Sequence, residues 1–322
     1  MVRLLRRRHF PMHQLVIFAR REREEVIDGE TYPVRKATPK SFEGMDFAFF
    51  AGTEGAKGAS RTLGWEAIKQ GCIVIDNGDD FRMDDRVPLV IPEINPGALT
   101  HHQGFVANPN CSTIIALMAI APLHRAAGVD RVVASTYQAV SGSGSSALAE
   151  LDDQVNARID KRSLVPKIFP HPIAFNVLPQ IGGVKDSSGS TSEELKMSRE
   201  TQKILEDETI RVTSTCVRVP VFNGHSVVLH VELRTPLTAG RAREILSAAE
   251  GITIKDDVDQ FVYPTPLASS GTENVLVGRI REDGSVENGL ALFVSGDNVW
   301  KGAALNAIQI AEKMIELNLE ST

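Results

Sequence analysis

The sequence predicts an α/β protein in which a doubly wound parallel sheet is followed by an α+β region with a mixed, largely antiparallel sheet. Up to residue 110, buried apolar strands alternate with helical segments, a pattern typical of parallel sheets. From Arg131 onward, several strands alternate polar and apolar residues, which indicates a sheet covered on one face. A length of 322 residues suits two domains.

The first region is expected to open with a basic amphipathic helix that Pro11 ends. Apolar runs then predict strands over 15–19, 46–51 and 72–76, and a helix around 63–70. Asp28-Gly29 lies in a charged, turn-rich stretch and predicts a small hairpin. A short strand that ends at Ala107 leads into a helix over 112–127. These elements would build the parallel sheet.

The second region is expected to contain strands over 131–136, 210–219, 227–233, 275–280 and 290–295. A helix is predicted over Ser192–Leu205, with Thr191 or Ser192 as its N-cap. The chain closes with a helix over 301–317 that we expect to pack back on the first domain. The predicted domains are therefore 1–110 together with 301–322, and 111–300.

Composition excludes several classes of protein. With 42% hydrophobic and 24% charged residues, the chain has the composition of an ordinary globular protein. A net charge of −6 gives no reason to expect a nucleic-acid or membrane-surface partner, and no apolar run is long enough for a bilayer span. Three widely spaced cysteines predict a reducing, cytoplasmic setting without a disulfide framework. CxxC and HExxH pairs are absent from the sequence, so we expect no metal site.

The segment 108–115 (NPNCSTII) is the strongest candidate for chemistry. Cys111 lies where a short strand passes into the predicted helix over 112–127. The unpaired N–H groups and positive end of a helix favour thiolate over thiol, and a thiolate attacks carbonyl carbon. A small buried hydrophobic residue is the alternative role of a lone cysteine, and position alone does not decide between the two.

A second candidate pair lies near the middle of the second region. His225 occupies a turn between two strands, where an imidazole with an ordinary pKa can exchange protons at neutral pH, although a surface histidine is the commoner reading. Arg218 lies inside an apolar strand, where an unpaired guanidinium would be costly. We therefore expect a bidentate partner for Arg218, either a protein carboxylate or a substrate carboxylate.

Three weaker signals complete the set. The segment 136–144 (TYQAVSGSG) follows a strand and has two glycines that allow a ligand close to the backbone. Arg82 follows a sheet strand at the end where α/β sheets bind ligands, and it could hold an anion or pair with a neighbouring aspartate. Glu193 and Lys196 are spaced i, i+3 on one helix, which is more often a plain surface pair than a site.

Taken together, these motifs resemble the aspartate-semialdehyde dehydrogenase family, in the same order and over essentially the whole chain. The segments that carry the resemblance are 108–113 (NPNCST), 135–142 (STYQAVSG), 175–177 (FNV), 218–221 (RVPV) with Gly224-His225, and 286–289 (VENG). N-acetyl-glutamyl-phosphate reductases carry a related cysteine loop, but the Asn-Cys-Ser-Thr form here looks like the semialdehyde enzymes.

The resemblance implies a Rossmann-like dinucleotide-binding domain, a catalytic and dimerisation domain, and a homodimer. It implies NADP-dependent, phosphate-dependent and reversible conversion of L-aspartyl 4-phosphate to L-aspartate 4-semialdehyde, in lysine, threonine and methionine biosynthesis.

The resemblance also implies a role for each matching residue. Cys111 would be the nucleophile, His225 the acid/base, and Gln138 the residue that orients the intermediate. Arg218 and Glu193 would hold the substrate's carboxylate and amine. Arg82 and Lys196 would hold phosphate, with Asn110 close to both. The residues that would face the nicotinamide are Ser141, Gly142 and Asn298.

The sequence departs from the family pattern at its start. The family opens with a strand and a glycine-rich turn that binds the NADP phosphates, and residues 1–11 here align with the helix after that turn. We expect Met1 to be an internal methionine of a protein that starts roughly 15–25 residues upstream, the length a strand, a turn and the first helical turns require. The sequence of the loop 50–58 (FAGTEGAKG) also differs from the usual family pattern. A related acyl-phosphate reductase and a non-catalytic paralogue without a cofactor site are the alternatives.

Overall fold

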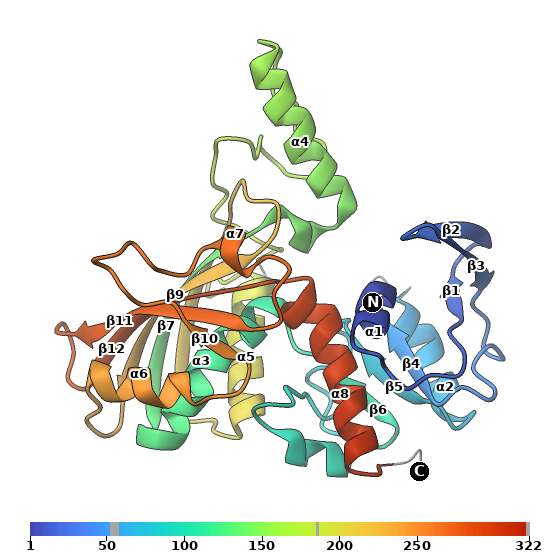
Figure 1. The fold of residues 1–322 in the computed structure, drawn as a ribbon, viewed down its shortest axis with the longest axis horizontal. Helices are drawn as coiled ribbons and strands as arrows, with labels where there is room; N and C mark the ends of the chain where they lie inside the picture. The colour runs from blue at the N-terminus through green and yellow to red at the C-terminus, as the bar shows by residue number, and fades with distance from the viewer. Residues whose placement is uncertain (52–57, 185–186, 320–322) are drawn as a thin grey trace. The chain divides into compact units, whose positions relative to one another are not determined.

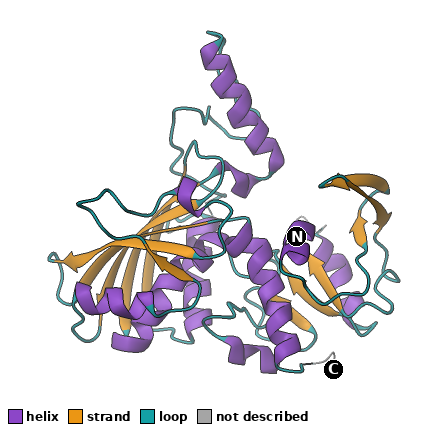
Figure 2. Cartoon of the chain, in the orientation of Figure 1, coloured by secondary structure: helices purple, strands orange, loops and turns teal. Residues whose placement is uncertain are grey.

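The chain forms two compact units in the computed structural model, which describes residues 1–51, 58–184 and 187–319 (Figure 1). Unit 1 comprises Met1–Pro109 and Ala304–Thr322, and unit 2 comprises Asn110–Ala303. Helices and strands are mixed in both units (Figure 2). Within the described residues, no helix combines the length and apolar character needed to cross a membrane.

A parallel three-stranded sheet forms the centre of unit 1. Its order is β4 (Phe47–Phe50), β5 (Ile73–Asp76) and β6 (Phe105–Ala107), and both pairings are parallel. Every residue of β5 and β6 is buried, which explains their continuous apolar sequence. The prediction of a parallel α/β sheet is confirmed.

The C-terminal helix α8 (Leu305–Glu316) packs on β5 and on α1 (Val2–Arg7). Arg8 and Glu312 form an ion pair of 2.7 Å between these two ends of the chain. The last helix therefore returns to unit 1, as the sequence predicts.

A second three-stranded sheet of unit 1 contains β1 (Ile17–Ala19), β3 (Glu30–Lys36) and β2 (Arg23–Ile27), in that order. β2 and β3 form an antiparallel hairpin whose turn, Asp28-Gly29, has φ values of 52° and 83°. Positive φ at both turn residues is the geometry that such a pair favours, so the hairpin prediction is confirmed. β1 and β4 are the end strands of their two sheets.

Two helices of unit 1 differ from prediction. α1 ends at Arg7 because His9 adopts a left-handed conformation (φ 52°) and the ring of Phe10 turns into the core, 6.3 Å from the ring of Phe47. Pro11 therefore follows the end of the helix and does not cause it. The region predicted as a helix around 63–70 is a π-helical turn, Ser60–Gly64, followed by the short helix α2 (Trp65–Ile68).

Unit 2 is built on a mixed six-stranded sheet. The strand order is β10 (Ile252–Ile254), β11 (Val275–Asp283), β12 (Gly289–Gly296), β9 (His225–Leu233), β7 (Val129–Gln138) and β8 (Arg211–Arg218). The outer pairs β10–β11 and β7–β8 are parallel and the three inner pairs are antiparallel. The prediction of a mixed, largely antiparallel sheet is confirmed.

One face of this sheet is covered by α3 (Cys111–Ala127), α5 (Ser192–Leu205) and α6 (Ala239–Ser247). Along β7, Val132, Ala134 and Thr136 are buried, whereas the residues between them are partly exposed. This alternation places one side of the strand against the helices. α3 and α5 follow the predicted bounds closely, and Thr191 is the N-cap of α5 within a capping box.

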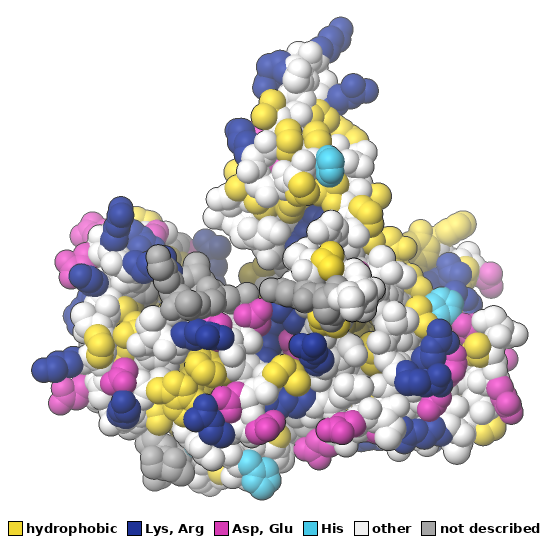
Figure 3. All heavy atoms as spheres, turned by 180° about the vertical axis from the view of Figure 1, so that it is seen from behind, with side chains coloured by type: hydrophobic (Ala, Val, Ile, Leu, Met, Phe, Trp, Pro, Cys, Tyr) yellow, Lys and Arg dark blue, Asp and Glu magenta, His cyan; other side chains and the backbone are white. Residues whose placement is uncertain are grey.

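Among the described residues, two α-helices longer than a single turn are missing from the sequence-based description: α6 and α4 (Ser145–Ile159). α4 and the segment after it share a small core of their own that includes Leu151 and Ile173. Hydrophobic side chains also gather on the outside of this region, with basic side chains at its tip (Figure 3). Ile159, for example, is 72% exposed. The short helix α7 is Pro266–Ser269.

Candidate active site

Cys111 is the first residue of α3, at the helix N-terminus. Asn110 is the N-cap, and its side-chain Oδ1 accepts hydrogen bonds from the backbone N–H groups of Ser112 (2.9 Å) and Thr113 (3.2 Å). Cys111 is partly exposed, whereas Cys72 and Cys216 are buried, and burial raises the pKa of each of those two thiols to about 12. Cys111 is thus placed differently from both inert thiols.

The π-helical turn Trp300–Ala304 lies against the cysteine. A Cβ atom on Gly302 would be 2.9 Å from the Cβ of Cys111, closer than side-chain atoms approach one another. Only glycine fits there without displacing Cys111. No sequence motif predicts this contact, although π-turns are frequent at functional sites.

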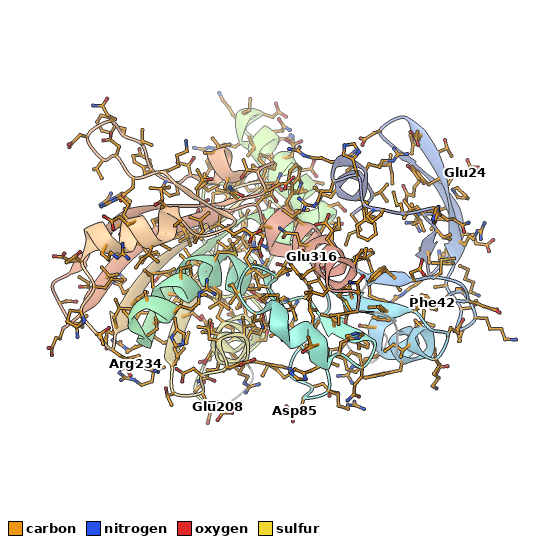
Figure 4. All side chains as sticks on the ribbon, turned by 60° about the horizontal axis from the view of Figure 1, so that its bottom comes forward. Glu24, Phe42, Asp85, Glu208, Arg234 and Glu316 are labelled. Carbon is orange, nitrogen blue, oxygen red and sulfur yellow. The ribbon has the colours of Figure 1, made fainter. Side chains whose placement is uncertain are left out.

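Gln138 ends β7 beside the start of α3. Its buried amide nitrogen donates hydrogen bonds to the hydroxyl of Ser112 and to Oε1 of Glu193 (3.3 Å). Arg234, which is labelled in Figure 4, marks the opposite end of the sheet. Its backbone N–H donates to the carbonyl of Gly128, just before β7 begins. The carboxyl ends of β7 and β8 and the N-terminus of α3 therefore meet at the site.

The backbone of Ala139 contacts two further predicted residues. Its carbonyl accepts a hydrogen bond from Nη1 of Arg218 (2.7 Å), and its N–H donates to Nδ1 of His225 (3.0 Å). Burial lowers the pKa of Arg218, an effect that Cys111 and Glu193 partly offset. Among the described residues, no carboxylate hydrogen-bonds to Arg218. The two sequence-based alternatives for its bidentate partner, a protein carboxylate and a substrate carboxylate, stay predictions.

His225 is a buried residue and not a surface histidine. It is the first residue of β9, and its side chain lies inside unit 2. Burial, followed by the charge of Arg218, lowers its pKa well below the ordinary value of 6.5, so the ring is neutral at pH 7. Nδ1 accepts a backbone N–H, which leaves the single ring proton on Nε2. Within the described residues, Nε2 has no hydrogen-bond partner.

Glu193 and Lys196 belong to the same group of side chains. Oε1 of Glu193 accepts a hydrogen bond from Nδ2 of Asn110 (2.9 Å), and Nζ of Lys196 lies 3.8 Å from Oε2 of Glu193. The pair is therefore part of the site and not a plain surface pair.

The predicted nicotinamide contacts lie at the same end of unit 2. Nδ2 of Asn298 donates to the hydroxyl of Ser141 (2.9 Å), and its Oδ1 accepts from the N–H of Gly224 (2.9 Å). A Cβ on Gly142 would be 2.9 Å from Nη1 of Arg218 and 3.1 Å from Nε2 of His225. The backbone at Gly142 thus passes directly beside both candidate side chains.

Arg82 is the one predicted site residue that lies in unit 1. It is buried, and it donates from Nε to the carbonyl of Asn108 (2.9 Å) and from Nη2 to the carbonyl of Asn77 (2.8 Å). Two neighbouring aspartates bind other arginines: Asp80 pairs with Arg61 and Asp84 with Arg86. The loop 50–58 falls largely outside the described residues, which omit 52–57.

The assembled groups suit acyl transfer at a cysteine. They provide a cysteine at a helix N-terminus, an imidazole N–H, an amide donor and a guanidinium. In the part of the chain that the structure describes, no three His, Cys, Asp or Glu side chains gather to hold a metal ion. Sequence reasoning missed Ser112, Gly302 and the buried Glu200, whose Oε2 accepts the N–H of Asn110 (2.6 Å). The spacing of Glu200 two helical turns after Glu193 was the available signal.

Comparisons with known proteins agree with this arrangement. Residues 1–102 match the model "Semialdehyde dehydrogenase, NAD binding domain", and residues 120–301 match "Semialdehyde dehydrogenase, dimerisation domain". The aspartate-semialdehyde dehydrogenase of Bacillus subtilis is 42% identical over 330 residues, covering 99% of this chain and 94% of that protein. That of Aquifex aeolicus is 42% identical over 328 residues, with the same two coverages of 99% and 94%.

A solved structure gives the same answer for the fold. Aspartate semialdehyde dehydrogenase II from Vibrio cholerae, complexed with ASA, superposes with a TM-score of 0.92 at 38% identity, covering 98% of this chain and 93% of that one. Sequence, family models and fold therefore converge, and the chain belongs to the aspartate-semialdehyde dehydrogenase family.

Proposed function

We propose that the protein catalyses the reversible, phosphate-dependent and NADP-dependent conversion of L-aspartyl 4-phosphate to L-aspartate 4-semialdehyde. The observation that carries this proposal is the partly exposed Cys111 at the N-terminus of α3. It follows Asn110 and precedes Ser112, to which Gln138 donates, and it is close enough to Arg218 to raise the pKa of that guanidinium. The names of the relatives from Bacillus subtilis and Aquifex aeolicus, and the ASA complex from Vibrio cholerae, support the choice of substrate.

Cys111 would act as the nucleophile in both directions. Its thiolate sulfur bonds to the carbonyl carbon of the aldehyde to form a thiohemiacetal, and the carbonyl π electrons move to the oxygen. In the direction of reduction, sulfur bonds to the acyl carbon and phosphate leaves with its bonding electrons, which gives a thioester. The N–H groups at the start of α3 favour the thiolate that each attack needs.

His225 would serve the oxygen that gains negative charge in these steps. Its neutral ring holds a proton on Nε2, so it can donate a hydrogen bond without first being protonated. Gln138 would hold the intermediate through its amide group, which lies beside Ser112 at the helix start. These roles agree with the donor half of the acid/base function that the family resemblance implies.

The nicotinamide end of NADP fits the residues present in unit 2. Gly142 has no side chain where one would collide with Arg218 and His225, and Ser141 and Asn298 offer a polar pair beside it for a carboxamide. When bound, NADP supplies hydride exchange with the substrate carbon. Two basic residues support the choice of NADP over NAD. Arg20 and Arg21 follow β1 at its carboxyl end, where a basic side chain can bind the 2′-phosphate on the ribose of NADP.

The charged residues would hold the ends of the substrate. The fork-shaped guanidinium of Arg218 suits a planar carboxylate, and Glu193 suits the amine. Arg82 and Lys196, with Asn110, would bind the dianionic phosphate.

At the level of the whole chain, we propose that unit 1 binds the dinucleotide and that unit 2 carries catalysis and pairs two copies of the chain. A cytoplasmic location agrees with the three free cysteines. The product would enter lysine, threonine and methionine biosynthesis.

Replacing Cys111 with serine tests the proposal. We expect Cys111→Ser to abolish phosphate-dependent formation of NADPH from aspartate semialdehyde, because a serine hydroxyl is far less ionised than a thiol at a helix N-terminus. Cys72→Ala is the matched control, since that thiol is buried directly before β5 and burial raises its pKa to about 12, which keeps it inert. Appreciable turnover by Cys111→Ser would refute the nucleophile assignment.

The same assay separates the neighbouring activities. The full chain should use NADP better than NAD, and aspartyl phosphate better than N-acetyl-glutamyl phosphate. A preference for the second acyl phosphate would identify a related reductase, and lack of turnover with either would identify a non-catalytic member of the family.

A further inference from the structure

Glu200 is a buried carboxylate that contacts the backbone next to the candidate nucleophile. It lies on α5, its side chain is almost fully buried, and its Oε2 accepts a hydrogen bond from the N–H of Asn110 at 2.6 Å. Glu193 precedes it by two helical turns and accepts a hydrogen bond from the side chain of Asn110 at 2.9 Å. One face of α5 therefore holds both the backbone and the side chain of the residue before Cys111.

The start of α3 depends on these contacts. Each polar group of Asn110 that points toward the helix or toward α5 has a partner: Oδ1 accepts two helix N–H groups, Nδ2 donates to Glu193, and the backbone N–H donates to Glu200. In an ordinary capping box, the residue at the third helical position accepts the N–H of the N-cap. That position in α3 is Thr113, whose hydroxyl has no partner among the described residues.

We propose that Glu200 is a positioning residue for Cys111, supplying from α5 the acceptor that α3 does not supply itself. By fixing the N–H of Asn110, it sets the residue at which α3 begins and therefore the direction in which the side chain of Cys111 leaves the helix. The inference rests on the proposed role of Cys111 as the nucleophile. It assigns Glu200 no contact with substrate.

The position of the acceptor oxygen and the charge of the side chain can be tested separately. The hydrogen-bond acceptor holds the helix start that favours the thiolate. Two conservative variants separate the effects: Glu200→Gln keeps an acceptor oxygen and removes the charge, and Glu200→Asp keeps the charge and withdraws the acceptor by about 1.5 Å.

The experiment measures alkylation of Cys111 by iodoacetamide across pH, together with kcat and KM, on the full-length protein. We expect Glu200→Asp to lower both kcat and the alkylation rate about tenfold or more, because a misplacement of about 1 Å can cost roughly 10²-fold. Its alkylation profile should shift to higher pH, and KM should change little. Glu200→Gln keeps the acceptor oxygen, so its alkylation rate and kcat should stay within about twofold of those of the parent protein. A shift of one unit in the pKa of Cys111 would instead correspond to a change of about tenfold.

Glu150 provides the matched control. It is also a buried glutamate, on α4, and accepts the backbone N–H groups of Lys167 (2.9 Å) and Ile168. Glu150→Asp should lower thermal stability and leave the alkylation profile of Cys111 unchanged. Mass spectrometry of the Cys111 peptide restricts the signal to one thiol, and the high pKa values of Cys72 and Cys216 keep their reaction slow.

Two results would overturn the proposal: a Glu200→Asp enzyme with parental alkylation and kcat, or a Glu200→Gln enzyme as slow as Glu200→Asp. If Glu200→Asp does not fold, Glu200→Gln decides alone, with parental rates in favour and a tenfold loss against. The Cys111→Ser assay keeps the underlying function separate. Turnover without the thiol would refute the nucleophile assignment, whatever the Glu200 variants show.

Discussion

At the scale of single residues, the backbone of Ala139 contacts two candidate catalytic side chains. It binds Arg218 through its carbonyl and His225 through its N–H, so the guanidinium and the imidazole are held beside one another. Arg218 remains charged despite its lowered pKa, because an arginine starts from 12.5. Burial, and after it the neighbouring positive charge, keeps His225 neutral. The carbonyl and the N–H of one residue therefore hold a cation and a neutral proton donor in place.

Replacing His225 tests this arrangement through activity. We expect His225→Asn to lower kcat by roughly 10²–10⁴-fold, the usual contribution of a positioned proton donor or acceptor. KM for aspartate semialdehyde should change much less, because the ring is assigned to the oxygen that gains charge and not to the ends of the substrate. Steady-state kinetics with both proteins is the measurement. A loss confined to KM would count against the role.

His225→Asn should also change how the free energy of unfolding depends on pH. The folded-state pKa of His225 lies below the unfolded value of 6.5, so the unfolded chain takes up a proton first as the pH falls. The contribution of His225 to stability is therefore complete above about pH 6.5 and is lost progressively below it. Urea unfolding at about pH 7 and about pH 5 should show a smaller difference for His225→Asn than for the parent. An unchanged difference would mean that the ring is not buried neutral.

The sequence predicted which side chains meet at the site better than it predicted their surroundings. Cys111, Gln138, Arg218 and His225 were identifiable from their motifs and lie at one end of unit 2. The burial of His225 and the carbonyl partner of Arg218 depend on pairings between β7 and two other strands. Such long-range register is not encoded in any local motif.

At the scale of secondary-structure elements, helix starts with a clear cap were predictable and irregular helices were not. The starts of α3 and α5 carry asparagine and threonine caps that are visible in the sequence. The π-turn Trp300–Ala304 has an ordinary helical pattern, and its widened form accompanies the contact of Gly302 with Cys111. α4 was missed because its buried residues pack against Ile173 and its neighbours, which follow some way along the chain.

The cap of α5 gives a prediction at this scale. Thr191→Ala removes the hydroxyl that accepts the N–H of Glu194, and should cost about 1 kcal/mol of unfolding free energy. Because α5 also carries Glu193, Lys196 and Glu200, we expect fraying of its first turn to raise KM for the substrate. Thermal unfolding and steady-state kinetics measure the two effects.

Thr238→Ala is the control for this helix. Thr238 caps α6 in the same way, with its hydroxyl accepting the N–H of Arg241 at 3.2 Å, but α6 carries no candidate site residue. It should lose a similar amount of stability and keep its KM. If both variants raise KM equally, the effect belongs to general loosening of unit 2 and not to α5.

At the scale of the whole molecule, the fold class was predictable because each sheet leaves its own periodicity in the sequence. The central strands of unit 1 are buried on both faces and read as continuous apolar runs. Strands of unit 2 such as β7 are covered on one face and alternate. The order of the strands in the six-stranded sheet could not be predicted, because periodicity does not report which strands are neighbours. The parallel pairs at the two ends of the sheet were unpredictable for the same reason.

The open face of that sheet is where we expect two chains to pair. The helices of unit 2 cover the face that carries Ala134 and Leu229, whereas Tyr137 and Phe293 lie on the other face, with ring centroids 6.4 Å apart. Tyr137 is exposed and Phe293 is partly exposed. Aromatic side chains are enriched at protein interfaces, and the region matches a model described as a dimerisation domain. A dimer through this face would bury both rings.

Sedimentation of the purified protein tests this pairing. The parent should sediment at twice the chain mass of 35.1 kDa, and Phe293→Arg should sediment as a single chain, because two desolvated guanidinium groups would face one another across the symmetric interface. Val26→Arg, at an exposed position on β2 in unit 1, is the control and should leave the dimer intact. Circular dichroism checks that Phe293→Arg is folded. A folded Phe293→Arg protein that still sediments as a dimer would place the interface elsewhere on unit 2, with the segment around α4 and its exposed Ile159 as the next surface to test.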